Sequence, residues 1–347
     1  MTELKIRHII NGRVVSLSDD RSIIVGQNYK VVKFLEDKGV ELAARAPCPL
    51  RRQVISPFRL LCRLFRHEIR GFVQLRDNRK VVATRQGLYY SETDEILLKP
   101  ALLPETGMEI KPPMTITVDS SERILWGEYW GNNSQREVRL FVSEDKGKSY
   151  RPFWTFKTGE VKHIHNILED NFSDCYWVCV GDQNKEPGIG RLSRDLKSLD
   201  WLVKGEQRYR AVTGFVFKDK IVYGTDTEKD FNAIYAVDKT TGKMEKLCQT
   251  PGSCIYAAKF GKWYTIGTSV EYFEKYSNNL ATLWISADAV NWRQVYQVEK
   301  DIFSKKYFQF GSIILPRNGW RHDEIVFSGQ ALKKIDNKVY VAQVIEG

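Results

Sequence analysis

The sequence predicts an all-β fold, a single β-propeller of repeated four-stranded blades around a central channel. Three observations favour this fold. Aspartate-containing turn motifs recur at intervals of roughly 50 residues, and each repeat shows the same order of short apolar strands. The chain also contains 9 Trp, 16 Tyr and 17 Phe. Large flat side chains pack well on pleated sheets, so this composition suits strands better than helices.

The repeat is clearest in the stretch FVSEDKGKSY at positions 141–150. Comparable turns carry the aspartates Asp37, Asp94, Asp145, Asp195, Asp238, Asp288 and Asp336. Apolar strands precede each turn and a further segment leaves it, which is typical of one propeller blade. Seven turns predict seven blades, and six remain possible if N-terminal strands complete the last blade and close the ring. Residues 1–347 are then one domain.

The turn itself has a physical rationale. Asp and Ser side chains can hydrogen-bond backbone amides in a tight turn, and Gly supplies a positive φ. The motif resembles the Asp box, S-x-D-x-G-x-T-W, of the sialidase-like (BNR-repeat) propellers. Ser143, Asp145, Gly147, Ser149 and Tyr150 match it, with Ser for Thr and Tyr for Trp. The resemblance implies that the turn is structural and lies on the outer edge, far from the active site.

One segment breaks the strand pattern. In SPFRLLCRLFRHEIR, Ser56 can cap a helix and Pro57 suits its first position, so an amphipathic helix is predicted at 56–68, between the first and second blades. Four arginines recur at helical spacing: Arg59, Arg63, Arg66 and Arg70. They form either a solvated face or a basic stripe that contacts an anionic ligand.

Composition limits the classes of function. The formal charge of +10 favours polyanions in general, but no basic run or recognition motif supports nucleic acid. No stretch approaches the roughly 20 apolar residues of a membrane span. The six cysteines lack metal-binding spacing, and no signal peptide is visible, so we expect a cytoplasmic monomer with reduced thiols.

Candidate functional residues are those that should reach one mouth of the channel. In propellers, the innermost strands and the loops after the second strand converge there. The residues that follow the second strands are Glu128, Tyr129, Asp182, Asp226 and Glu271. The residues at the innermost strands are His163, His165, Tyr209 and Arg210. Carboxylates at the same position of four repeats indicate a shared site.

These residue types suit chemistry on an acidic oligo- or polysaccharide. Glu128, Asp182 and Asp226 are the acid/base candidates, and His163 and His165 are bases or sugar ligands. The candidates for substrate binding are Arg210, which would hold a carboxylate, with Tyr129, Tyr209 and Glu271. Glycoside hydrolysis is the first hypothesis and a lyase reaction the second. The alternative is a non-catalytic propeller that binds a glycan or a protein, because the arginine triad of sialidases has no clear match.

The two histidines also raise the question of a metal. They are two positions apart on a strand, so they share a face. With Asp182 or Asp226 they could bind a divalent cation. The sequence does not fix a third ligand, and we therefore assign neither a metal nor a cofactor.

Overall fold

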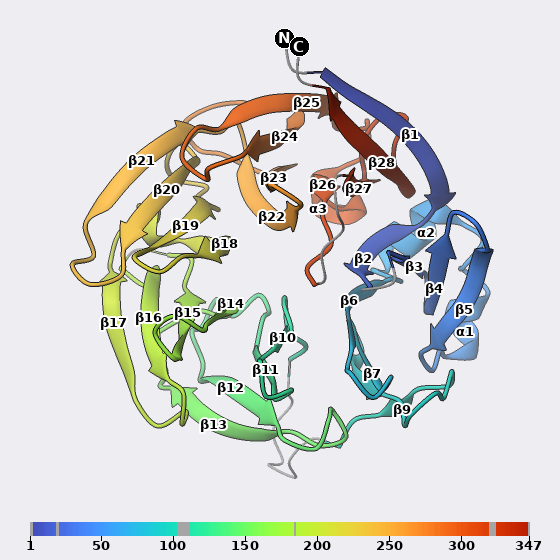
Figure 1. Cartoon of the computed structure of the whole chain (residues 1–347), viewed down its shortest axis with the longest axis horizontal. Helices are drawn as coiled ribbons and strands as arrows, with labels where there is room; N and C mark the ends of the chain where they lie inside the picture. Colours follow the sequence, from blue (N-terminus) through green and yellow to red (C-terminus); the bar gives the residue numbers. More distant parts are fainter. Residues whose placement is uncertain (1–2, 19–20, 103–110, 184, 319–323, 346–347) are drawn as a thin grey trace.

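The computed structural model describes residues 3–18, 21–102, 111–183, 185–318 and 324–345. Within them, antiparallel sheets surround a central axis (Figure 1). Four-stranded sheets are formed by β2 (Arg13–Leu17), β3 (Ile23–Gln27), β4 (Lys30–Leu35) and β5 (Gly39–Arg45); by β6 (Ile69–Gln74), β7 (Lys80–Thr84), β8 (Gly87–Tyr90) and β9 (Lys99–Pro100); by β10 (Thr117–Val118), β11 (Ile124–Gly127), β12 (Val138–Ser143) and β13 (Arg151–Phe156); by β14 (Ile164–Asp170), β15 (Cys175–Val180), β16 (Gly188–Ser193) and β17 (Leu199–Lys204); and by β18 (Ala211–Val216), β19 (Lys220–Thr225), β20 (Ala233–Asp238) and β21 (Met244–Gln249).

The remaining strands form one eight-stranded sheet made of two four-stranded arrays. The first array is β22 (Ser253–Phe260), β23 (Trp263–Val270), β24 (Leu280–Ser286) and β25 (Arg293–Glu299), and the second is β26 (Gly311–Ile314), β27 (Glu324–Gln330), β28 (Lys338–Ile345) and β1 (Glu3–Asn11). Pairing of β23 with β26 joins the arrays. Because β1 pairs with β28, the two ends of the chain lie together and close the ring (Figure 1).

The core lies between neighbouring sheets. In β15, all six residues are buried, because both faces of this strand are covered by the adjacent sheets. Leu125 of β11, for example, packs in one cluster with Ile164 of β14 and Tyr176 of β15. The outermost strands are partly exposed, as in β13 and β21.

The aspartate turns are held by their own side chains. Ser143 Oγ donates to Asp145 Oδ1 at 2.8 Å, and the Gly147 amide donates to Ser143 Oγ at 2.8 Å. Ser149 donates to Asp145 from both its amide and its hydroxyl. The Ser-to-Asp hydrogen bond recurs in two further turns, from Ser193 to Asp195 and from Ser286 to Asp288. The turn chemistry predicted from the sequence is therefore present in these three turns, whereas Asp336 differs, because it lies between β27 and β28 and accepts from Arg59.

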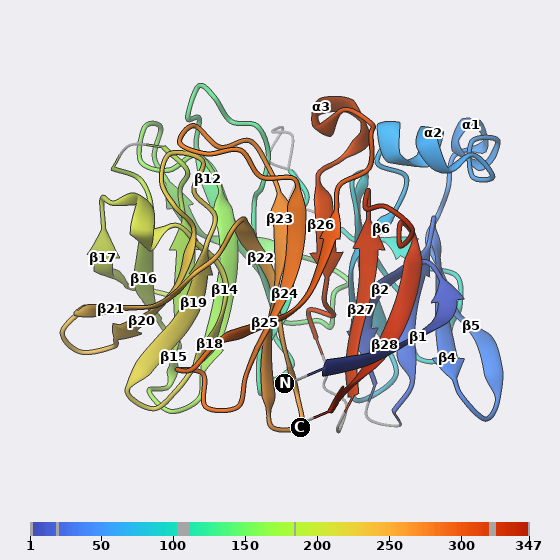
Figure 2. The same ribbon diagram turned by 90° about the horizontal axis from the view of Figure 1, so that it is seen from above.

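The helices in this segment are shorter than the one that the sequence pattern predicts. The structure has α1 (Leu50–Gln53) and α2 (Arg59–Leu64) instead of one helix over 56–68. Ser56 does not cap α2, because its hydroxyl contacts His67 Nε2 at 2.8 Å. Figure 2 shows α1, α2 and α3 (Lys305–Phe308) at one end of the ring, and a 3₁₀ helix, η1, spans Gln207–Tyr209.

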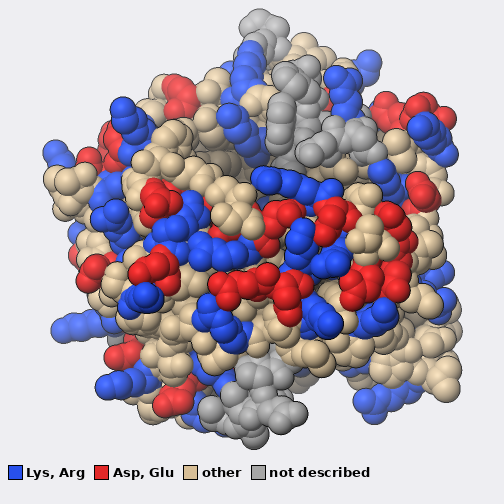
Figure 3. All heavy atoms as spheres, turned by 60° about the horizontal axis from the view of Figure 1, so that its bottom comes forward, with Lys and Arg blue, Asp and Glu red and all other residues tan. Residues whose placement is uncertain are grey.

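The charge of the surface is mixed. On the face shown in Figure 3, Lys and Arg side chains alternate with Asp and Glu, so the net positive charge does not gather there in a single patch. In the described residues, no helix has the length and apolar character needed to cross a bilayer.

Candidate functional site at the channel mouth

Two histidines open the innermost strand β14. His163 precedes the strand, and His165 is the additional residue of a β-bulge, where pairing with β15 shifts between Ile164 and Asn166. A bulge changes the direction of a side chain relative to the regular alternation of a strand. Both side chains are almost completely buried. Corresponding register shifts occur in β2, β6, β18 and β22, so the bulge belongs to the repeated architecture.

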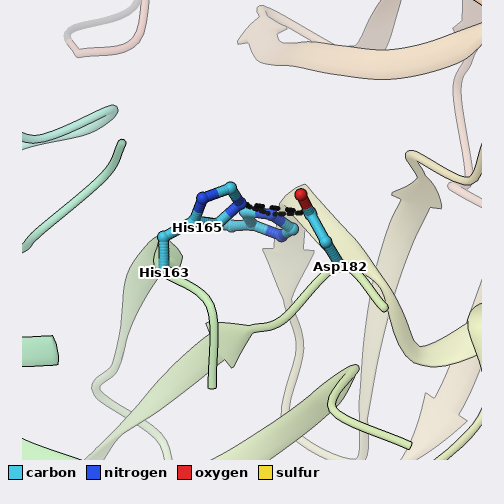
Figure 4. A group of neighbouring side chains, drawn as sticks. All are labelled: His163, His165 and Asp182. Atoms are coloured by element: carbon cyan, nitrogen blue, oxygen red, sulfur yellow. Dashed lines mark hydrogen bonds and ion pairs between the residues drawn. The ribbon is translucent and has the colours of Figure 1, made fainter. Parts of the chain in front are cut away.

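The two imidazoles converge on Asp182, which follows β15. The Nε2 atoms of His163 and His165 lie 3.1 Å apart, and each lies 3.1 Å from Asp182 Oδ1 (Figure 4). The Nδ1 atoms point the other way. His163 Nδ1 lies 2.9 Å from the Trp130 carbonyl oxygen, and His165 Nδ1 lies 2.9 Å from the Ala211 carbonyl oxygen. Burial lowers the pKa of His163 more than the neighbouring Asp182 carboxylate raises it.

Two cations complete the surroundings of Asp182. Lys162 Nζ lies 2.9 Å from Asp182 Oδ2, and Arg210 Nη2 lies 3.0 Å from Oδ1. The same Arg210 nitrogen lies 3.2 Å from Asp226 Oδ2 and 4.0 Å from Glu228. Arg210 thus joins the carboxylates that follow the second strands of two neighbouring sheets.

One carboxylate oxygen of this group is buried and free. Asp226 is 5% exposed, and its Oδ1 has no hydrogen-bond partner among the described residues. Glu271, after β23, faces the same group of charges. Burial, followed by the charge of Asp226, raises the pKa of Glu271 well above its usual value. The site therefore combines an ion-paired carboxylate with a carboxyl group that favours its protonated form.

Tyr129 lies across the histidines. Its ring centroid is 4.2 Å from that of His163 and 6.2 Å from that of His165. Burial raises the pKa of Tyr129, and the charges of Asp182 and Asp226 raise it further, so the hydroxyl keeps its proton at neutral pH.

Two further arginines lie beside Tyr256. Arg13 Nη2 donates to the Tyr256 hydroxyl at 2.9 Å, and the Arg317 guanidinium lies 4.5 Å from the centre of the same ring. Arg13 also lies 3.6 Å from Glu68, whereas no carboxylate of the described residues contributes to the surroundings of Arg317. Burial lowers the pKa of Arg317, and so does the nearby charge of Arg13.

The structure brings most of the predicted site residues together. The group comprises Tyr129, His163, His165, Asp182, Arg210, Asp226 and Glu271. Glu128 differs, because its carboxylate is bound by the Arg139 guanidinium at 2.9 and 3.1 Å and by the Arg139 amide. Tyr209 also differs, because its hydroxyl donates to Glu206 at 2.8 Å and its ring packs under Arg208.

Sequence reasoning missed three basic residues of this site. Lys162 immediately precedes His163, so its position in the repeat was a usable signal. Arg13 is the first residue of β2, the innermost strand of its sheet. The repeat could have predicted this position as well. Arg317 follows β26 and Pro316, and only the folded chain shows that it reaches Tyr256.

No protein-family model and no curated protein sequence matches this chain. Solved structures do match it. An oligogalacturonate lyase from Vibrio parahaemolyticus aligns with a TM-score of 0.65 at 8% identity, over 100% of this chain and 98% of that one. An oligogalacturonate lyase in complex with manganese gives a TM-score of 0.62 at 8% identity, over 99% and 91%.

A further likeness is to the extracellular domain of the putative hybrid two component system BT4673 from B. thetaiotaomicron, with a TM-score of 0.60 at 10% identity. It covers 98% of this chain but only 42% of that one. The fold is a β-propeller. At these identities the comparisons concern the fold, and the role of the site has to be argued from its own residues.

Proposed function

We propose that this propeller acts on an acidic glycan at the channel mouth, with cleavage of a glycosidic bond by acid/base chemistry. The proposal depends chiefly on Asp226 and Glu271. Asp226 is ion-paired with Arg210, and its other, buried oxygen has no hydrogen-bond partner among the described residues, so it can accept a proton. Glu271 favours its protonated form beside that charge, so it can donate a proton to a leaving oxygen. A carboxyl group whose raised pKa keeps it protonated, beside an ion-paired carboxylate, is typical of such chemistry.

The arginines support an anionic substrate. Arg317 has no carboxylate partner among the described residues and lies beside Arg13, so a substrate carboxylate there would relieve the repulsion between two guanidinium groups. Tyr129 offers a protonated hydroxyl and a ring face for a sugar. Glu128 has a structural role in this proposal, since Arg139 already binds its carboxylate.

Other parts of the proposal concern the number of blades, the oligomeric state and the origin of the fold. We take the seven four-stranded arrays as seven blades of a monomer, and the Ser143–Asp145 turn supports a distant sialidase-like origin. The structural likeness to proteins named oligogalacturonate lyases is compatible with a carbohydrate role. Analysis of the product distinguishes hydrolysis of the glycosidic bond from its cleavage by elimination.

The test is a screen of uronate-containing and other acidic oligosaccharides. New reducing ends and the ultraviolet absorbance of unsaturated products are followed together. Reducing ends without absorbance indicate a hydrolase, and absorbance indicates a lyase. In either case Asp226→Asn and Glu271→Gln should lower kcat/KM at least 100-fold, the lower bound for loss of an acid or base.

The control is Asp230→Asn, an exposed aspartate in the same loop as Asp226 that pairs with Lys275. It should leave activity unchanged. Thermal stabilisation by the sugars without any turnover would overturn the catalytic proposal and favour a binding propeller.

A further inference from the structure

We propose that His163, His165 and Asp182 form a binding site for a divalent transition-metal ion. This inference goes beyond the proposed glycan chemistry and does not depend on it. It rests on the positions of three donor atoms and on the hydrogen bonds that hold the two imidazoles.

The hydrogen bonds at Nδ1 determine which ring nitrogen carries the proton. A carbonyl oxygen can only accept, so the Trp130 and Ala211 carbonyls require a proton on each Nδ1. In the neutral imidazoles, both Nε2 atoms then present lone pairs. Donation of the second ring nitrogen to a backbone carbonyl is also the usual arrangement of histidines that bind metals.

Three acceptors therefore face one another. The Nε2 atoms of His163 and His165 and the Oδ1 atom of Asp182 form a triangle with sides of 3.1 Å. One shared proton would satisfy only one of these contacts and leave two acceptors opposed. A divalent cation bound to all three atoms uses the lone pair that each of them directs at the other two.

The size of the triangle fits such an ion. An ion about 2.0–2.2 Å from each atom, the usual distance for nitrogen and oxygen ligands, would make ligand–metal–ligand angles of about 90–102°. These angles are close to those of three adjacent positions of an octahedron, with the remaining positions open for water or substrate. Two imidazoles and one carboxylate suit several first-row transition metals.

The surroundings can accommodate the added charge. Arg210 shares Asp182 Oδ1 but also contacts Asp226, so it keeps a partner when Oδ1 binds the ion. Asp226 supplies further negative charge, and its buried Oδ1 has no hydrogen-bond partner in the described part of the chain. His165 lies on β14, His163 directly precedes that strand, and Asp182 lies in the loop after the paired strand β15, so the site is preorganised.

The experiment measures metal binding without any glycan. Chelator-treated full-length protein is titrated with Mn²⁺, Co²⁺ and Zn²⁺, each alone, and bound metal is counted after equilibrium dialysis. We expect one ion per chain for at least one of these metals, a ligand-field absorption band with Co²⁺, and a higher melting temperature. His163→Ala, His165→Gln and Asp182→Asn should each weaken binding at least tenfold, as loss of a metal ligand requires.

His8→Ala removes an exposed histidine on β1 and should leave binding unchanged. Far-ultraviolet circular dichroism and the melting temperature of each metal-free variant establish that it is folded, and folded variants alone are compared. The proposal is overturned if no ion binds below millimolar concentration, or if binding by the folded Asp182→Asn and His165→Gln proteins equals that of the parent. It would also be overturned if His8→Ala abolished the binding.

Discussion

Arg63 and Asp301, far apart in the sequence, form an ion pair with 2.5 Å between Nη1 and Oδ2. Arg63 lies on α2 and is 1% exposed, and its guanidinium also donates to the Phe308 carbonyl in α3. Arg59 of the same helix makes a bidentate contact with Asp336. Two arginines of the predicted basic stripe therefore attach the inserted helix to the closing part of the ring.

Arg63→Ala should lower the free energy of unfolding by about 3 kcal/mol, because it removes a buried guanidinium and leaves the part-buried Asp301 with Lys300 as its ion-pair partner. Chemical denaturation measures this change. Arg51→Ala, at an exposed arginine of α1, is the control and should change stability by less than about 0.5 kcal/mol. Equal effects of the two substitutions would show that the pair does not hold the helix.

Glycines allow neighbouring sheets to approach closely. A Cβ atom at Gly127 would lie 2.4 Å from Ile164 Cβ, and one at Gly224 would lie 2.2 Å from Cys254 Cβ. In both cases the second strand of one sheet meets the first strand of the next. Gly127→Ala and Gly224→Ala should each cost about 1–3 kcal/mol of stability through overpacking.

The control for the glycine substitutions is Gly131→Ala, because a Cβ atom there has no neighbour within 4 Å. Its effect should be smaller than either of the others in the same denaturation experiment. A destabilisation by Gly131→Ala that matched the other two would attribute the loss to the backbone rather than to the contact between sheets.

Asp145 should affect stability without affecting the site. Burial opposes ionisation, but hydrogen bonds from Ser149 and Ser143 outweigh it and lower the pKa of Asp145. Ionised Asp145 therefore stabilises the folded protein at pH values above its unfolded pKa of about 3.9. This stabilisation is lost as the pH falls below that value toward the folded pKa. Asp145→Ala should lower the free energy of unfolding by about 1–2 kcal/mol at pH 7. The difference should shrink in acid, and kcat/KM for any substrate found should stay unchanged.

The repeat allowed much of this fold to be predicted. The spacing of Asp145, Asp195 and Asp288 located the turns, and the register of the repeat placed Asp182 and Asp226 at one mouth. The same register placed Glu128 there too, but Arg139 on the adjacent strand binds its carboxylate. The periodicity of the strands does not predict such an ion-pair partner.

The short-range details depend on contacts that the sequence does not reveal. His165 is the extra residue of a bulge, and its aim toward Asp182 follows from the pairing of β14 with β15. Ser56 has the chemistry of a helix cap but contacts His67 instead. Arg317 reaches Tyr256 only because β22 and β26 lie in neighbouring arrays around the channel.

Titration of Glu271 makes the stability of the folded protein depend on pH. Its pKa in the folded protein is raised, first by burial and then by Asp226, relative to an unfolded value of about 4.3. The folded state therefore binds a proton that the unfolded state releases, and stability falls as the pH rises from the unfolded toward the folded pKa. Glu271→Gln cannot ionise, so its melting temperature should rise relative to the parent as the pH increases from about 5 to about 8.

The control is Glu274→Gln, at an exposed residue nearby, whose melting temperature should follow that of the parent. If the parent and Glu271→Gln kept a constant difference in melting temperature over this range, Glu271 would titrate as an ordinary exposed carboxyl group and could not serve as the proton donor.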